Sequence, residues 1–161
     1  MTIHKLHVEE YDEIDYQLIA IHSTLEDFRL AYYINQNLPI NLKKSNCDLQ
    51  VSNKEGETQF TRFVFEDEKD ILWSLVQNQN KAVVSNLTVN QGLFSNSEDT
   101  MSTKIYLIPE FKKVDYFLKI ENDEVAIDMI QITNQLKKIE RISAVYSVEV
   151  EKIKSKNNLI F

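Results

Sequence analysis

The chain has 161 residues, of which 43% are hydrophobic, and it carries a formal net charge of −7 at pH 7. This length suits one domain with its own core, and the hydrophobic content exceeds that of disordered chains. The negative charge removes the sequence-independent attraction to phosphate that drives most nucleic-acid binding, and it disfavours anionic membranes. We therefore predict a single domain over residues 1–161 that binds neither nucleic acid nor a membrane directly.

The first forty residues predict a strand followed by a helix. Residues 15–22 form a short apolar run after an acidic turn, which indicates a central strand. Thr24 is the expected N-cap of the helix, and Pro39 forbids continuation beyond about Leu38. The apolar residues at helical spacing, which we expect on the buried face, are Leu25, Phe28, Ala31 and Tyr32.

Residues 42–86 predict a series of strands. Alternating apolar residues indicate strands at 42–52, Thr58–Phe65, Ile71–Leu75 and 81–86. Turns are expected around Gly56 and in the acidic link at 66–70, which is typical of a hairpin connection. The stretch at 86–103 is rich in Asn, Ser, Asp and Thr, so we predict a long surface loop there.

The second half of the chain predicts a hairpin, a helix and a last strand. Strands at 105–108 and 114–120 are expected to join through a turn over Glu110–Lys113, since Pro109 cannot donate to a strand ladder. A helix at about 123–139 and a strand at 142–150 follow. The apolar stripe of this helix consists of Val125, Met129, Ile132, Leu136 and Ile139.

These elements form two strand–helix–strand units, at 15–51 and 114–150, separated by extra strands. Each helix has one apolar stripe, so we predict an α+β fold with a mainly antiparallel sheet and two helices packed on one face. The second unit is similar to half of a ferredoxin-like fold, as found in ACT-type regulatory domains. This analogy concerns architecture and does not assign a function.

Residues 108–116 read Ile-Pro-Glu-Phe-Lys-Lys-Val-Asp-Tyr. This segment resembles the signature of the IPExxxVDY family, which consists of uncharacterised proteins of Bacteroidota. The resemblance implies a bacterial cytosolic context, with genes for ribonuclease III or pyruvate kinase nearby in related genomes, and it implies no activity. It leaves open an accessory role in RNA metabolism through a protein partner. The six defining positions are Ile108, Pro109, Glu110, Val114, Asp115 and Tyr116.

The patterns of common cofactor sites are missing from the sequence. Phosphate-binding loops need clustered glycines, and the only two glycines, Gly56 and Gly92, lie far apart. Cys47 is the only cysteine, which excludes an intramolecular disulfide and a zinc–thiolate cluster. We expect no cofactor, and we expect Cys47 to be a half-buried strand thiol.

No metal site is predicted either. His4 and His7 are three residues apart in an extended segment, where an odd spacing places two side chains on opposite faces, and His22 is remote in sequence. The acidic runs at 9–13 and 66–68 lack the ligand spacing and the turn glycine of a calcium loop. We expect these runs to be solvated turn charges.

No catalytic residue is predicted. Ser23 follows His22 but lacks the nucleophile elbow of a hydrolase. Glu110 and Asp115 flank a tight turn, and a role as acid and base would require an enclosing pocket that separates their pKa values. The structural alternative is that Glu110 accepts backbone hydrogen bonds in the turn while Tyr116 packs in the core.

The segment at 153–161 is predicted to be a C-terminal tail, polar and basic at first and then apolar over the last three residues. Burial of those three would contribute about 1.5–3 kcal/mol for each side chain, either within the domain or on another protein. The candidate interaction surface, from the signature and the tail, consists of Glu110, Phe111, Asp115, Tyr116, Leu159, Ile160 and Phe161.

We expect a non-enzymatic cytoplasmic protein that acts through an unknown protein partner or as a homo-oligomer. The first residues lack the basic and apolar regions of a signal peptide, and no apolar stretch approaches the ~18 residues of a membrane span. The alternative is a small-ligand-sensing, ACT-like regulatory domain. A pocket between sheet and helix would favour the alternative, whereas a large exposed apolar patch would favour protein binding.

Overall fold

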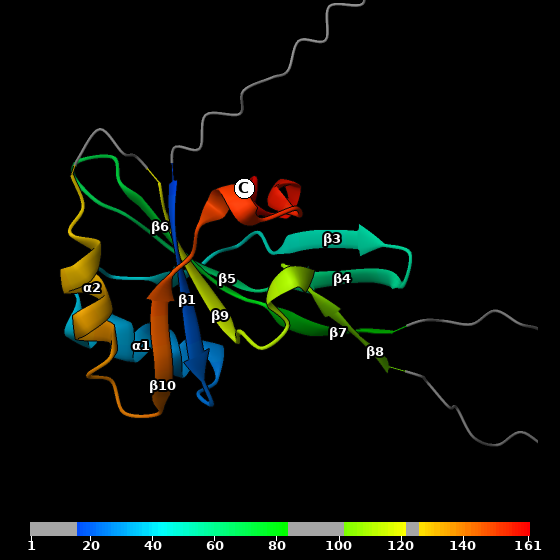
Figure 1. Cartoon of the computed structure of the whole chain (residues 1–161), viewed down its shortest axis with the longest axis horizontal. Coiled ribbons are helices and arrows are strands. Elements are labelled where there is room, and N and C mark those ends of the chain that lie inside the picture. Colours follow the sequence, from blue (N-terminus) through cyan, green and yellow to red (C-terminus); the bar gives the residue numbers. More distant parts are fainter. Residues whose placement is uncertain (1–15, 84–101, 122–125) are drawn as a thin grey trace, which may run out of the picture.

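The computed structural model describes residues 16–83, 102–121 and 126–161. Its centre is a six-stranded sheet with the order β10-β1-β9-β6-β5-β2, in which all neighbours are antiparallel (Figure 1). Its strands are β1 (Tyr16–Ser23), β2 (Lys43–Lys44), β5 (Arg62–Glu66), β6 (Leu72–Gln77), β9 (Tyr116–Glu121) and β10 (Ile142–Ser147). Two separate hairpins pair β3 (Leu49–Asn53) with β4 (Gly56–Phe60) and β7 (Gln79–Val83) with β8 (Ser102–Tyr106).

The helices α1 (Asp27–Asn37) and α2 (Met129–Leu136) pack on the same face of the sheet (Figure 1). The predicted α+β class, with a mainly antiparallel sheet and two helices on one face, is confirmed. The buried side chains of the helices and of the facing strands form one apolar cluster, which includes Ile19, Ile21, Leu30, Ile34, Leu75, Leu118, Ile120, Ile132, Leu136 and Ile139.

The apolar stripe predicted for the second helix is found in the described part of the chain. Its members Ile132, Leu136 and Ile139 are buried and Met129 is partly buried, while Val125 lies outside the described residues. The helix begins later than predicted, at Met129. The carboxylate of Asp128 caps this start, because it accepts a hydrogen bond of 3.0 Å from the backbone N–H of Gln131.

The opposite face of the sheet is covered by a second layer that the sequence did not indicate. The layer contains both hairpins and three 3₁₀ turns, η1 (Pro109–Phe111), η2 (Val150–Lys152) and η3 (Lys156–Leu159). Strand β9 is therefore buried on both of its faces from Tyr116 to Ile120. The apolar cluster of this layer includes Leu18, Ala20, Phe60, Val76, Ile105, Leu107, Phe117, Val150 and Leu159.

Two predictions of strand pairing are wrong. The unit predicted at 15–51 does not form, because β2 pairs with β5 at the far edge and residues 49–53 belong to the β3–β4 hairpin. The hairpin predicted between 105–108 and 114–120 does not form, since β8 pairs with β7 and β9 lies between β1 and β6. The unit predicted at 114–150 is present as β9–α2–β10, with β1 inserted between its two strands.

Several local predictions are also corrected. The strand predicted at Thr58–Phe65 is interrupted at Thr61. The strand predicted at 81–86 begins earlier, at Gln79, and its residues 84–86 lie outside the described residues. Residues 102 and 103, predicted within the loop at 86–103, belong to β8, and the rest of that loop lies outside the described residues. Cys47 is exposed in the bend between β2 and β3 and is not a strand thiol. Neither helix of the described residues has the length and apolar composition needed to cross a bilayer.

Candidate functional site

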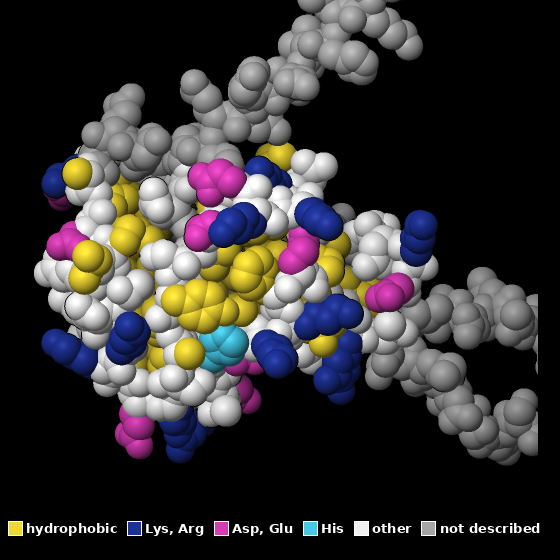
Figure 2. All heavy atoms as spheres, in the orientation of Figure 1, with side chains coloured by type: hydrophobic (Ala, Val, Ile, Leu, Met, Phe, Trp, Pro, Cys, Tyr) yellow, Lys and Arg dark blue, Asp and Glu magenta, His cyan; other side chains and the backbone are white. Residues whose placement is uncertain are grey.

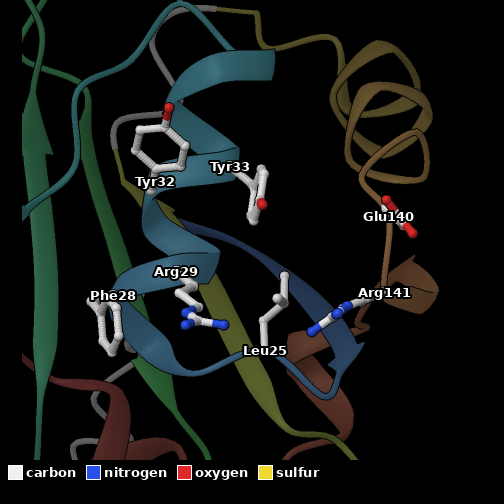
Figure 3. Close-up of a pocket in the computed structure, with 7 residues that line it drawn as sticks. All are labelled: Leu25, Phe28, Arg29, Tyr32, Tyr33, Glu140 and Arg141. Atoms are coloured by element: carbon white, nitrogen blue, oxygen red, sulfur yellow. The ribbon is translucent and has the colours of Figure 1, made fainter.

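A groove of about 490 Å³ opens between α1 and the loop that precedes β10 (Figure 3). Three aromatic side chains of α1 border it and are largely exposed: Phe28 by 56%, Tyr32 by 59% and Tyr33 by 43%. Phe28 and Tyr32 were predicted on the buried face, and this prediction is wrong, because Leu30, Ala31 and Ile34 fill that face. The full lining consists of Leu25, Phe28, Arg29, Tyr32, Tyr33, Glu140 and Arg141.

Two arginines give the groove its donors. Arg29 lies 3.7 Å from the Glu26 carboxylate, in an exposed ion pair that contributes at most about 1 kcal/mol. Arg141 makes no ion pair with any residue that the structure describes, and its side chain extends toward Leu25 in Figure 3. The groove thus combines aromatic walls with one guanidinium, that of Arg141, for which the described residues supply no carboxylate partner.

The backbone of Arg141 is held in an uncommon conformation. Its φ of 69° lies in the left-handed region, which costs a residue other than glycine roughly 1–3 kcal/mol. The hydroxyl of Ser23 donates a hydrogen bond of 3.0 Å to the Arg141 carbonyl oxygen and helps to hold this turn. The strain places the Arg141 side chain beside the groove instead of in line with β10.

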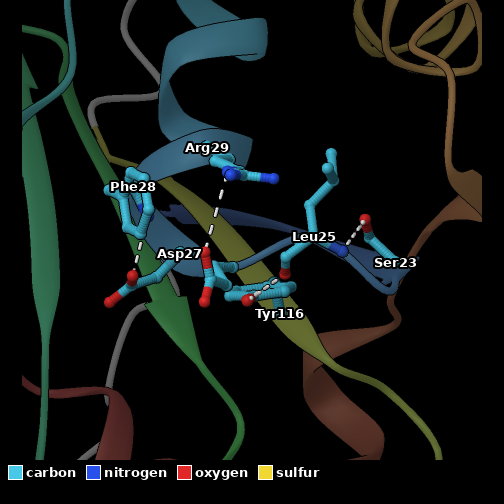
Figure 4. Close-up of polar contacts among 7 residues, drawn as sticks. Ser23, Leu25, Asp27, Phe28, Arg29 and Tyr116 are labelled. Atoms are coloured by element: carbon cyan, nitrogen blue, oxygen red, sulfur yellow. Dashed lines mark hydrogen bonds and ion pairs between the residues drawn. The ribbon is translucent and has the colours of Figure 1, made fainter.

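The floor of the groove is the β1–α1 loop, which the signature residues Asp115 and Tyr116 brace by hydrogen bonds. Figure 4 shows the bond from Tyr116 to Leu25. The Tyr116 hydroxyl donates to the Leu25 carbonyl oxygen at 2.6 Å, and the Asp115 carboxylate accepts from the Ser23 backbone N–H at 2.9 Å. The Ser23 hydroxyl oxygen accepts from the Leu25 N–H at 3.1 Å. These bonds fix both backbone ends of a loop that otherwise has no regular structure.

Burial raises the pKa of Tyr116 to about 12, and the nearby negative charges of Asp27, Asp115 and Glu26 act in the same direction. The hydroxyl therefore stays protonated at neutral pH and remains a donor to Leu25. Tyr116 is only 4% exposed, in agreement with the packed role considered from the sequence. Asp115 is exposed at the surface, although one of its oxygens is engaged by Ser23.

A buried asparagine, Asn78, organises the signature segment. Its backbone N–H donates to the Asp115 carbonyl oxygen and its carbonyl oxygen accepts from the Leu107 N–H, both at 2.8 Å. Its side chain accepts from the Ile108 N–H and donates to the carbonyl oxygens of Phe111 and Val114, at 2.8, 2.8 and 3.0 Å. Sequence reasoning missed this residue, because an asparagine in a polar run between strands has no signal that separates it from a loop residue.

Glu110 of the signature binds the C-terminal segment. Its carboxylate accepts hydrogen bonds from the backbone N–H groups of Lys154 and Ser155 and from the Ser155 hydroxyl, at 2.7, 2.8 and 2.7 Å. The predicted backbone hydrogen bonds are therefore present, but they come from a distant segment and not from the turn around Glu110. Desolvation by itself would raise the pKa of this carboxyl, yet the bonds from the Ser155 hydroxyl and the backbone N–H groups outweigh it and lower the pKa.

The remaining candidate surface residues occupy different environments. Phe111 is partly buried and meets the Phe117 ring edge-on, with centroids 6.1 Å apart. Leu159 is 1% exposed, and its carbonyl oxygen accepts a hydrogen bond of 2.7 Å from the buried ammonium group of Lys119. The ring of Phe161 lies 4.5 Å from the same ammonium group, whereas Ile160 is 76% exposed. Of the three apolar tail residues, two therefore dock within the chain and one faces solvent.

The described residues contain no cluster of three His, Cys, Asp or Glu side chains that could hold a metal ion. His22 shares a hydrogen bond of 3.2 Å with the Tyr146 hydroxyl, and His4 and His7 lie outside the described residues. In the acidic link before β6, the Asp67 carboxylate accepts from the N–H groups of Lys69 and Ile71 and closes the turn. The acidic run at 9–13 lies outside the described part.

Comparison of the chain with protein-family models, with curated proteins and with solved structures finds no match. From the sequence alone, the aromatic residues of the groove cannot be distinguished from core residues until the buried face of α1 is known. Once Leu30, Ala31 and Ile34 are placed in the core, helical spacing puts Phe28, Tyr32 and Tyr33 on the solvent side.

Proposed function

We propose that this protein is a binding module whose groove beside α1 receives an acidic and partly apolar segment of a partner protein. The observation that carries the proposal is that the exposed rings of Phe28, Tyr32 and Tyr33 line the same groove as the guanidinium of Arg141. Tyrosine, phenylalanine and arginine are the residue types enriched at the cores of protein interfaces. Exposed aromatic side chains on a helix of 11 residues are otherwise a liability for solubility.

The chemistry of the lining specifies the partner. A carboxylate of the partner would pair with Arg141, which has no ion pair among the described residues, and apolar side chains would cover the aromatic walls. The bracing of the β1–α1 loop by Asp115 and Tyr116 keeps the floor of the groove in one shape before binding, which lowers the entropic cost of association. The resemblance to the IPExxxVDY signature implies that the partner is a bacterial cytoplasmic protein. Proteins of RNA metabolism are one such class.

Affinity purification from the native cytosol, followed by mass spectrometry, tests this proposal with matched variants. The double variant Phe28→Ala with Tyr32→Ala should lose a partner that the wild type recovers, while Ile130→Ala, which alters an exposed apolar residue of α2 outside the groove, should keep it. Arg141→Asn should weaken the same complex, because asparagine tolerates the left-handed backbone but carries no charge. Identical partner sets for the wild type and the groove variants would refute the proposal.

A second candidate function, the sensing of a small ligand, rests on a different cleft. A space of about 170 Å³ lies between the end of α1, strand β6 and the start of α2. Trp73 is 7% exposed and forms part of its wall, and its indole N–H is buried with no hydrogen-bond partner. Such a buried donor normally has a partner, and a ligand that enters the cleft and shifts its wall would bring an acceptor group to this N–H. The lining residues are Leu38, Pro39, Trp73, Asp128, Gln131, Ile132 and Gln135.

Trp73 is the only tryptophan of the chain, so its fluorescence reports on this cleft directly. Free amino acids are suitable probes, because a carboxylate would accept from the indole N–H and an ammonium group would face Asp128. Ligand sensing predicts a saturable change of emission with one of the twenty amino acids, and loss of that change in Asp128→Asn. Emission that stays constant up to millimolar concentrations of every amino acid would exclude this candidate.

A further inference from the structure

The outer edge of strand β10 is open in the described part of the molecule. The Val148 N–H donates to the Leu18 carbonyl oxygen at 2.8 Å, which sets the alternation of the β1–β10 ladder. In an antiparallel ladder the backbone groups of alternate residues point to opposite sides, so those of Val145 and Ser147 point away from β1. They form no hydrogen bond with any described residue, and no strand lies beyond β10 in the sheet.

The two edges of the sheet are built differently. At one edge β2 has only two residues, Lys43 and Lys44, and both are exposed. A very short strand with lysines is a device by which proteins prevent edge-to-edge pairing. β10 has six residues, Ile-Ser-Ala-Val-Tyr-Ser, with no charge and no proline, and its one irregularity is a bulge near its start. One edge is protected against pairing and the other is left able to pair.

We propose that β10 pairs with β10 of a second copy of this chain, antiparallel about a two-fold axis, so that two six-stranded sheets join into one. With the axis at Val145, its N–H donates to the carbonyl oxygen of the partner subunit's Val145, and the reverse bond follows by symmetry. The exposed Tyr146 side chain then lies opposite the partner subunit's Ala144, a large residue against a small one, and this contact occurs twice.

The charges that flank the strand favour a second copy over an unrelated strand. Arg141 precedes β10 and lacks an ion pair among the described residues, while Glu149 follows β10, with a side chain that is 67% exposed in a surface ion pair with Lys152. Antiparallel pairing brings the Arg141 end of each copy to the Glu149 end of the other. Figure 2 shows the face that carries β10, where apolar side chains form a band between charged ones. An uncharged strand with opposite charges at its two ends is self-complementary.

Light scattering coupled to size-exclusion chromatography tests this proposal on the full chain, whose monomer mass is 18.9 kDa. The wild type should show twice this mass at high concentration. Ser147→Pro should restore the monomer, because it removes an outward N–H while the Val148 bond to Leu18 remains. Tyr146→Lys adds two charges beside the axis and should weaken the dimer at least about tenfold. Tyr32→Lys, the same substitution in the groove, should leave the dimer unchanged.

A wild type that stays at 18.9 kDa up to millimolar concentration would overturn the proposal. So would a dimer that persists in either β10 variant while circular dichroism shows an intact fold. If Ser147→Pro fails to fold, Tyr146→Lys decides the question alone, since its side chain is exposed. Arg141 takes part in both proposals, but neither β10 variant changes a lining residue of the α1 groove, so the dimer is tested without altering the groove.

Discussion

Replacement of Asn78 by alanine should destabilise the protein by several kcal/mol, although the residue is polar and lies in no helix or strand. The substitution removes three side-chain hydrogen bonds inside the molecule. The Ile108 N–H and the Val114 carbonyl oxygen lose the partner that the structure shows for them, while the Phe111 carbonyl oxygen still accepts from the Val114 N–H at 3.0 Å. Two buried backbone groups are therefore left without a partner.

The magnitude follows from these groups. Each of the two unsatisfied buried groups costs about 1–3 kcal/mol, and the third bond contributes about 0.5–1.5 kcal/mol, so we expect a loss of about 3–8 kcal/mol. For a domain of this size, 1 kcal/mol shifts the melting temperature by about 2–4 °C. The melting temperature should therefore fall by at least about 6 °C. The expected loss of free energy is comparable with the whole stability of a marginal domain, about 5 kcal/mol.

Urea unfolding, followed by the fluorescence of Trp73 and by circular dichroism, measures this loss. Asn37→Ala is the matched control, because the Asn37 amide makes one exposed bond of 2.8 Å, to Tyr33, and its loss should cost at most about 1 kcal/mol. Asn78→Asp keeps the acceptor for Ile108 but turns an anion toward two carbonyl oxygens, so it should be as harmful at pH 7 and recover partly in acid. A loss below about 1 kcal/mol for Asn78→Ala would refute the role assigned to Asn78.

Three further predictions concern the signature and the tail. Because the pKa of Glu110 is lowered in the folded state, this carboxylate stabilises the fold above the ordinary pKa of a carboxyl, and the stabilisation is lost as the pH falls through the folded pKa. Below pH 4.5, the urea midpoint should therefore fall less in Glu110→Gln than in the wild type. An equal fall in both proteins would contradict the stabilising role of the bonds from Lys154 and Ser155 to Glu110. Tyr116→Phe leaves the Leu25 carbonyl oxygen unpaired and should cost about 1–3 kcal/mol. Because the pKa of Tyr116 is raised, the stabilisation by its hydroxyl is fully present below pH 10 and is lost as the pH rises toward about 12. The absorbance of ionised tyrosine should show one group that titrates near pH 12 in the wild type and not in Tyr116→Phe. Deletion of residues 159–161 should lower the melting temperature by several degrees, because Leu159 is buried; an unchanged value would show that the docking is energetically neutral.

The sequence predicted what depends on local periodicity. The β9–α2–β10 unit was recognised because Ile132, Leu136 and Ile139 repeat at helical spacing next to two alternating strands. The face of α1 was assigned wrongly, since that helix carries apolar residues on two faces and periodicity cannot decide which of them meets the sheet. The predicted hairpin after 105–108 failed for a related reason. A turn with proline indicates a change of direction, but it does not identify the strand that pairs with β8.

The site was less accessible from the sequence than the fold. The signature drew attention to Glu110, Asp115 and Tyr116, and the structure shows each of them hydrogen-bonded to a segment at least forty residues away in the chain. The groove depends on Arg141, whose position results from a left-handed turn at the end of a loop. No local pattern encodes such an approach, because it requires α1 and the loop between α2 and β10 to meet on the same face of the sheet.

The signature segment connects the two layers of the molecule. Glu110 faces the layer that contains the C-terminal turns and binds Lys154 and Ser155, whereas Tyr116 faces the helical layer and binds the loop beneath the groove. Asn78 holds the backbone between them, since it bonds to Ile108 on one side and to Asp115 on the other. A disturbance at Asn78 should therefore reach both layers, while one at Glu110 should loosen the tail and leave the groove intact. The stability of the tail and the shape of the groove are consequently separable at Glu110, and they are joined at Asn78.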